Sequence, residues 1–164
     1  MRNRFFLLLL ASVLSGSPAL AAGNPSGFLG GYTLNGTTKV DVDAVGYHRE
    51  FHPPLETVVT RGAADGELVF TITRLGHTCR LTAVAESDTA VTFSAGQKCP
   101  ATIEESAFTA DLTGTLRSGR ASLNGKAVRL VADWDVEGTV KVWGMTIPGT
   151  PKGRMYNDAS GTTP

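Results

Sequence analysis

Apolar and polar residues alternate one by one along much of this chain, and this period of two constrains the fold more than any other feature. Successive side chains of a β-strand point to opposite faces, so the alternation predicts strands with one buried and one solvated face. No comparable helical period follows residue 22. The alternating segments lie at residues 39–44, 68–73, 79–83, 91–93, 108–116 and 128–136.

Short polar turns join these segments. Asn124-Gly125 is a strong hairpin signal, because the tight turn that it favours needs positive φ at both central positions. Such short links predict that neighbouring strands pair in sequence as an antiparallel meander. Closing the meander removes its two exposed edges, so we expect an all-β, up-and-down barrel of about eight strands. A β-sandwich is the alternative.

The first 22 residues have the features of a secretory signal peptide. Arg2 and Arg4 precede an apolar stretch, and Ala19-Leu20-Ala21 fits the small-x-small pattern of a cleavage site. The apolar stretch is too short for a membrane span. We therefore expect an exported protein, periplasmic or secreted.

The rest of the chain suffices for one domain with a substantial core. We place a single β-barrel domain at residues 23–149. Residues 150–164 are rich in Gly, Pro, Ser and Thr and lack periodicity, which predicts a flexible C-terminal tail.

The chain has two cysteines, Cys79 and Cys99. An even pair in an exported protein usually forms a disulfide, because the compartment is oxidising. A bond that closes a loop of about 20 residues would stabilise the fold by roughly 3 kcal/mol in the chain-entropy model. We predict this disulfide.

Composition argues against several classes of function. The 15 basic and 15 acidic residues balance, and the basic residues are scattered singly, which is unlike a nucleic-acid or membrane-surface binder. No serine-nucleophile, phosphate-loop or dinucleotide motif occurs after the signal peptide. We therefore expect a non-enzymatic protein without a cofactor.

The segment "GYHREFHPP" carries the best candidates for a metal site. In an extended strand, His48, Glu50 and His52 project to the same face. The two histidines would lie about 13 Å apart along a straight strand, which is too far to share one ion. A metal site would therefore need a bend or a ligand from another strand. The alternative is a polar strand end before Pro53-Pro54.

The segments "TCRLTAVAESDTAVTFSAGQKC" and "FTADLTGTLRSGRASLNGKAVRLVADWDV" combine a hairpin stapled by the predicted disulfide with amphipathic strands. Over about residues 31–147 this architecture resembles small exported bacterial lipocalin-like β-barrels and, more loosely, periplasmic metalloprotease inhibitors. Tyr32 in "GGYTL" stands where the lipocalin entry motif has Trp.

The resemblance implies a protein that binds a small apolar ligand in the barrel lumen or a protein partner at its rim. A ligand would lie among apolar residues on the inward faces of the predicted strands: Leu68, Phe70, Phe93, Phe108, Leu112, Leu130 and Trp134. The first alternative is a protease inhibitor that acts through residues 23–30, "GNPSGFLG". The second is a metal-binding protein that uses the histidine segment.

Overall fold

The computed structural model describes residues 23–74, 76–106 and 108–163 of the chain. The predicted signal peptide, residues 1–22, lies outside this part. Strands make up most of it, as the alternation predicts. Two short 3-10 helices, η1 Pro25–Phe28 and η2 Asp43–Val45, accompany the strands β1 Gly30–Val42, β2 Tyr47–Phe51, β3 Leu55–Arg61, β4 Glu67–Arg74, β5 His77–Ser87, β6 Ala90–Phe93, β7 Lys98–Glu104, β8 Phe108–Asn124, β9 Ala127–Val142, β10 Met145–Thr146 and β11 Lys152–Thr162.

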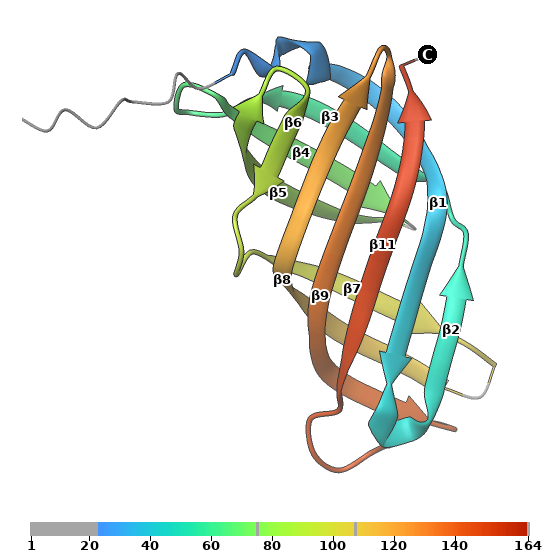
Figure 1. The fold of residues 1–164 in the computed structure, drawn as a ribbon. Helices are drawn as coiled ribbons and strands as arrows, with labels where there is room; N and C mark the ends of the chain where they lie inside the picture. Colours follow the sequence, from blue (N-terminus) through green and yellow to red (C-terminus); the bar gives the residue numbers. More distant parts are fainter. Residues whose placement is uncertain (1–22, 75, 107, 164) are drawn as a thin grey trace, which may run out of the picture.

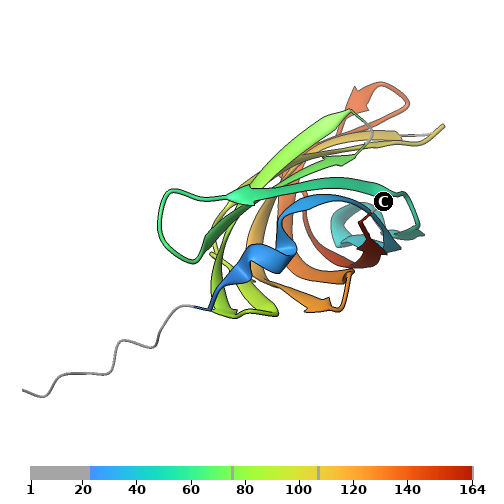
Figure 2. The ribbon, with the colours of Figure 1, turned by 90° about the horizontal axis from the view of Figure 1, so that it is seen from above.

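Eight of these strands close into an antiparallel barrel (Figures 1 and 2). Around the ring the order is β9, β11, β1, β3, β4, β5, β6 and β8, and pairing of β8 with β9 completes the circle. The fold is therefore the predicted barrel rather than a sandwich. Three strands lie outside the ring, because β2 pairs with β1, β7 with β8 and β10 with β9.

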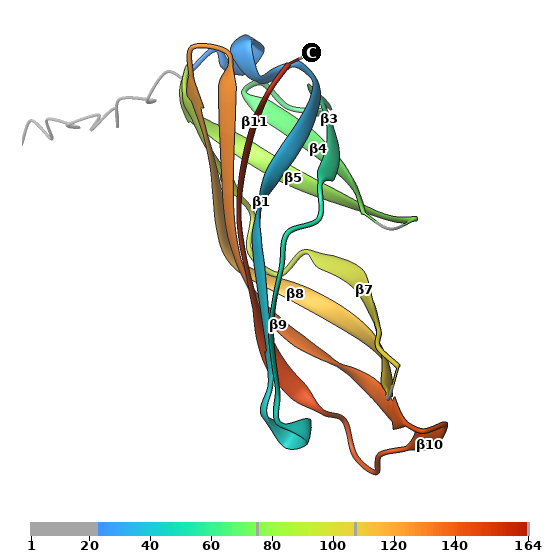
Figure 3. The ribbon, with the colours of Figure 1, turned by 90° about the vertical axis from the view of Figure 1, so that its right-hand side faces the viewer.

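The long strands change partners along their length. Residues 120–122 of β8 pair with β6, whereas residues 109–115 pair with β7. In the same way, residues 30–34 of β1 pair with β3 and residues 38–42 pair with β2. The ends of β1, β8, β9 and β11 thus continue past the ring and form, with β2, β7 and β10, an open curved sheet (Figure 3). We call this sheet the extension.

Aromatic side chains fill the interior of the ring. Phe70 is fully buried, and its ring centroid lies 4.9 Å from that of Phe93 and 6.4 Å from that of Phe28. Phe28 belongs to η1, which lies across the end of the ring remote from the extension (Figure 1). Full burial of each such side chain contributes about 1.5–3 kcal/mol. This end of the barrel is therefore closed by the protein's own side chains.

The predicted hairpin at Asn124-Gly125 forms between β8 and β9, but its loop is shifted by one residue. Asn124 pairs with Ala127, so Gly125 and Lys126 are the two loop residues. Gly125 has a φ of +61°, which a glycine adopts without steric cost. Positive φ is therefore needed at one central position of this turn rather than at both.

The expectation of a flexible tail at residues 150–164 is wrong for most of that segment. Lys152–Thr162 is β11, which is one of the eight strands of the ring and lies between β1 and β9. It pairs with β9 over its whole length and with β1 over residues 154–160. Met155, Asn157 and Ala159 alternate into the interior. The barrel domain therefore extends to residue 162 rather than ending at residue 149.

Candidate functional site

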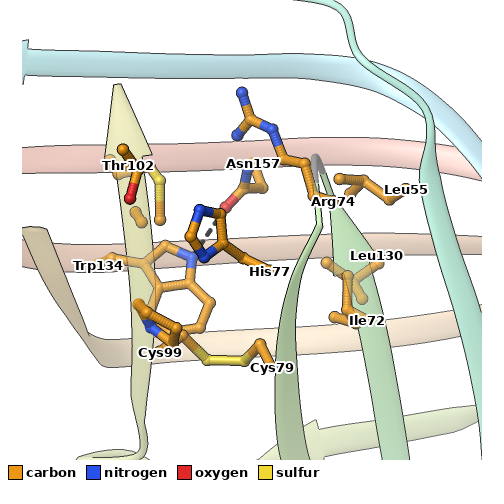
Figure 4. A pocket seen from close by; sticks show the side chains of 13 residues that line it. Leu55, Ile72, Arg74, His77, Cys79, Cys99, Thr102, Leu130, Trp134 and Asn157 are labelled. Atoms are coloured by element: carbon orange, nitrogen blue, oxygen red, sulfur yellow. Dashed lines mark hydrogen bonds between the residues drawn. A yellow bond between two sulfur atoms is a disulfide. The ribbon is translucent and has the colours of Figure 1, made fainter. Parts of the chain in front are cut away.

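Two adjoining pockets lie where the ring opens towards the extension, a region that we call the mouth. Each has a volume of about 100 Å³, and Arg74, Ala101, Thr102 and Met155 line both. The pocket nearer the ring, here the barrel pocket, is also lined by Leu55, Ile72, His77, Cys79, Cys99, Pro100, Leu130, Trp134 and Asn157 (Figure 4). The other, here the extension pocket, is also lined by Val40, Phe51, Ile103, Glu104, Leu112 and Val136.

Strand alternation explains why these side chains meet. On β9, Leu130 and Trp134 both lie on the inward face of the strand, and both line the barrel pocket. On β4, the inward positions are Leu68, Phe70, Ile72 and Arg74. The first two are buried in the filled part of the ring, and Ile72 and Arg74 follow at the mouth. The inward face of β4 thus ends on a cation.

Arg74 is a half-buried arginine that forms no hydrogen bond or ion pair with any residue that the structure describes. Its Nε atom is buried without an acceptor. Its guanidinium carbon lies 5.7 Å from the centroid of the Phe51 ring, a cation–π contact. Burial lowers the pKa of Arg74, while the nearby Tyr47 acts in the opposite direction. A positive charge therefore stands between two apolar pockets without a counter-ion.

A buried polar network supports the wall behind Arg74. The indole Nε1–H of Trp134 donates to Oδ1 of Asn157 at 2.9 Å. The amide Nδ2–H of Asn157 donates in turn to Oγ1 of Thr38 at 2.8 Å. These bonds connect β9, β11 and β1, which are neighbours in the ring. They hold the Trp134 ring in place at the barrel pocket (Figure 4).

The predicted disulfide is present and borders the barrel pocket. Cys79 and Cys99 are bonded, with Cα atoms 5.3 Å apart. Cys79 lies in β5 and Cys99 in β7, and these strands are not hydrogen-bonded neighbours. The bond therefore joins the ring to strand β7 of the extension. It was predicted to staple a hairpin, whereas it fixes β7 across the mouth.

The predicted lining residues divide between four places. Leu130 and Trp134 line the barrel pocket, and Leu112 lines the extension pocket. Leu68, Phe70 and Phe93 are buried inside the filled ring. Phe108 lies in the extension, where its ring packs edge-on against Tyr47 at a centroid distance of 4.7 Å.

The histidine segment lies at an exposed edge, on and just after β2. His48 Nδ1 lies 2.9 Å from Oδ1 of Asp41 on the neighbouring strand. His52 Nε2 lies 3.5 Å from Oε1 of Glu50, whose other oxygen lies 3.5 Å from Lys39. Within the described ranges, no three His, Cys, Asp or Glu side chains come together as metal ligands. The structure thus gives these residues separate partners.

Residues 23–30, the segment of the inhibitor hypothesis, do not extend away from the barrel. Asn24 begins η1 as its N-cap, and its backbone N–H donates to Asp88. Phe28, at the end of η1, is wholly buried. The segment closes one end of the ring.

No protein-family model, curated protein or solved structure matches this chain. The closed eight-stranded antiparallel barrel agrees with the lipocalin-like architecture that the sequence suggests. In the part of the chain that the structure describes, no helix has the length and apolar character to cross a membrane.

Sequence reasoning missed Arg74, Met155 and Asn157 at the mouth. For Arg74 a signal was available, because it continues the inward phase of Leu68, Phe70 and Ile72. Asn157 and Met155 belong to residues 150–164, whose Gly-, Pro-, Ser- and Thr-rich composition predicts a tail and so hides their inward positions. The position of β7 opposite β4 depends on long-range contacts that no local pattern reports.

Proposed function

We propose that this protein is an exported, non-enzymatic binding protein that takes up a small, mainly apolar ligand at the mouth of its barrel. One observation carries the proposal: two apolar pockets adjoin at the open end of a barrel whose opposite end is filled by side chains. Concave sites lined by apolar side chains with a few polar groups are typical of small-molecule sites. A relation to lipocalin-like binding proteins is part of this proposal.

The lining favours binding over chemistry. Leu130, Trp134 and Met155 offer aliphatic, aromatic and thioether surface, and both cysteines are held in the disulfide. Burial of apolar surface contributes about 25 cal/mol per Å², so such a lining binds chiefly by excluding water. Each pocket is smaller than the roughly 300–1,000 Å³ of a typical drug-sized site. We therefore infer a slender ligand that extends from one pocket to the other past Arg74.

A fluorescence titration with 1-decanol tests this proposal. Trp143 is 78% exposed, so a Trp143→Phe background leaves Trp134 in the barrel pocket as the reporter. We expect saturable change of its emission as decanol is added. Ala101→Phe, which adds a large side chain where the two pockets meet, should abolish this response. The matched control is Ala127→Phe, which enlarges another half-buried strand alanine at the remote end of β9.

The far-ultraviolet spectrum and thermal midpoint of both variants show whether they fold. Loss of the response in Ala101→Phe alone supports the mouth as the site. An equal response in the two folded variants, or the absence of any saturable response before mutation, would contradict it.

A further inference from the structure

We infer that the ligand is an amphiphile with one carboxylate head group, which Arg74 binds while the apolar body lies in the adjoining pockets. This inference rests on the proposed function and names the class of ligand for the same site. It starts from the guanidinium between the barrel pocket and the extension pocket. No carboxylate among the described residues pairs with that guanidinium.

The cost of this arrangement in the absence of a ligand points to an anion. A buried donor without an acceptor is destabilising, and the Nε–H of Arg74 is such a donor. The cation–π contact with Phe51 attracts the guanidinium but gives the Nε–H no hydrogen-bond acceptor. An ionised oxygen close to the guanidinium would supply both an acceptor and the missing counter-charge.

A carboxylate matches the planar guanidinium of Arg74 in geometry and in charge. Its two oxygens accept two parallel N–H bonds from the planar guanidinium fork, which a lysine ammonium cannot reproduce. Since Nε is enclosed, a small rotation of the side chain would bring Nε–H and one terminal nitrogen to the two oxygens. Charge-assisted hydrogen bonds of this kind are roughly twice as strong as bonds between neutral groups.

The surroundings of Arg74 specify a single head group. The groups facing it are Phe51, the phenol of Tyr47, Ala101 and Met155, together with His77, which pairs with Arg74 across the β4–β5 hairpin and lines the barrel pocket. Glu104 borders the extension pocket and would repel a second anion there. A ligand with one carboxylate can leave its charge at Arg74 and bury its body against Trp134 or Leu112.

The test compares three probes that share one tail: decanoate, 1-decanol and decylammonium. Each is titrated at pH 8 into the Trp143→Phe protein, with Trp134 emission as the readout. The same series is repeated in Arg74→Met, which keeps the length and apolar stem, and in Arg74→Lys, which keeps the charge. Arg80→Met is the matched control, because it removes an exposed arginine from the neighbouring strand β5.

We expect decanoate to bind about 10- to 100-fold more tightly than decanol, because a hydrogen bond between two charged groups is stronger than one to a neutral hydroxyl. Decylammonium should bind more weakly than decanol. Arg74→Met should abolish the preference for decanoate while leaving decanol binding nearly unchanged. Arg74→Lys should restore part of the preference, and Arg80→Met should retain all of it.

The two proposals fail in different ways. Equal affinity for decanoate and decanol, or a preference that survives Arg74→Met, would overturn the carboxylate inference and leave the mouth as an apolar site. Absence of saturable binding for all three probes would overturn both the proposed function and the inference.

Discussion

Trp134 and Asn157 join two ring strands through a buried hydrogen bond of 2.9 Å between the indole Nε1–H and the amide oxygen. The Nδ2–H of Asn157 donates in turn to Oγ1 of Thr38. A buried polar group is stable only when it is paired, so this network fixes a single arrangement of β9, β11 and β1 behind the barrel pocket.

Replacing Asn157 with Ala should destabilise the protein by about 2–4 kcal/mol, because the change leaves a buried indole donor and a buried hydroxyl without their partner. Urea unfolding followed by Trp134 emission measures this loss. Asn35→Ala, an exposed change on β1, should stay within about 0.5 kcal/mol of the parent protein. Similar stabilities for the two variants would show that the network does not hold the wall.

Replacing both Cys79 and Cys99 with Ser should lower the free energy of unfolding by about 3 kcal/mol, the value for a loop of this length. The physical reason is that the open chain regains the conformations that the bond forbids. Unfolding in urea with and without dithiothreitol measures the effect. The reductant should shift the midpoint of the parent protein and leave the double variant unchanged. A parent midpoint that the reductant does not move would be inconsistent with a stabilising bond.

Removing residues 152–164 should prevent folding, because β11 pairs with both β9 and β1. Its loss opens the ring and exposes two strand edges, a larger penalty than the 5–15 kcal/mol by which domains are typically stable. Near-ultraviolet circular dichroism and protease resistance measure the outcome. Removal of residues 163 and 164 alone is the control and should leave both signals intact. Survival of the native spectrum in the longer deletion would restore the interpretation of this segment as a loose tail.

Tyr47 should contribute to a loss of stability at alkaline pH. Burial raises the pKa of its phenol to about 12 from an ordinary value of 10.0, and the nearby Glu105 carboxylate adds to the effect. A raised pKa in the folded state gives stability that is fully present below about pH 10 and is lost as the pH rises through about 12. Phenolate absorbance and unfolding measured over this window test the prediction.

Tyr47→Phe should remove the phenolate that forms near pH 12 and flatten the fall in stability between pH 10 and 12. Tyr156→Phe, on the outer face of β11, is the control for the loss of any one tyrosine. If both variants retain the same alkaline profile as the parent protein, Tyr47 does not control it.

Period-two alternation predicted the barrel because it reports directly which face of each strand is buried. Leu68 and Phe70 on β4, and Leu130 and Trp134 on β9, all point inward as expected. The disulfide followed from its chemistry and from the expectation of export. Its architectural role did not follow, because β7 pairs with β8, the next strand along the chain, and hydrogen-bonds neither to β5 nor to β6.

β11 was missed because its inward face is less apolar than those of the other strands. Met155, Asn157 and Ala159 do alternate. From the sequence alone, however, a buried asparagine looks the same as an exposed one until its hydrogen-bond partners on β9 and β1 are known. Gly161 adds to the loop-like composition. A Cβ at this position would lie 2.1 Å from the carbonyl oxygen of Thr33, so close backbone approach requires glycine there.

The histidine segment shows the opposite limitation. The alternation correctly placed His48 and Glu50 in one strand, but it could not specify what lies beside them. Asp41 faces His48 from β1 and shares a hydrogen bond with it, and Lys39 faces Glu50 as an exposed ion pair, so both side chains already have partners. Partners from a neighbouring strand are invisible in a local pattern.

Nuclear magnetic resonance of the two indole Nε1–H groups tests most directly whether the mouth is a ligand site. The chain has two tryptophans, Trp134 at the barrel pocket and Trp143 exposed at the turn between β9 and β10. Addition of decanoate should move the Trp134 signal in a saturable manner and leave the Trp143 signal in place. In Arg74→Met, the same movement should require about 10- to 100-fold more decanoate. A Trp134 signal that stays fixed, or two signals that drift together without saturation, would contradict ligand binding at the mouth.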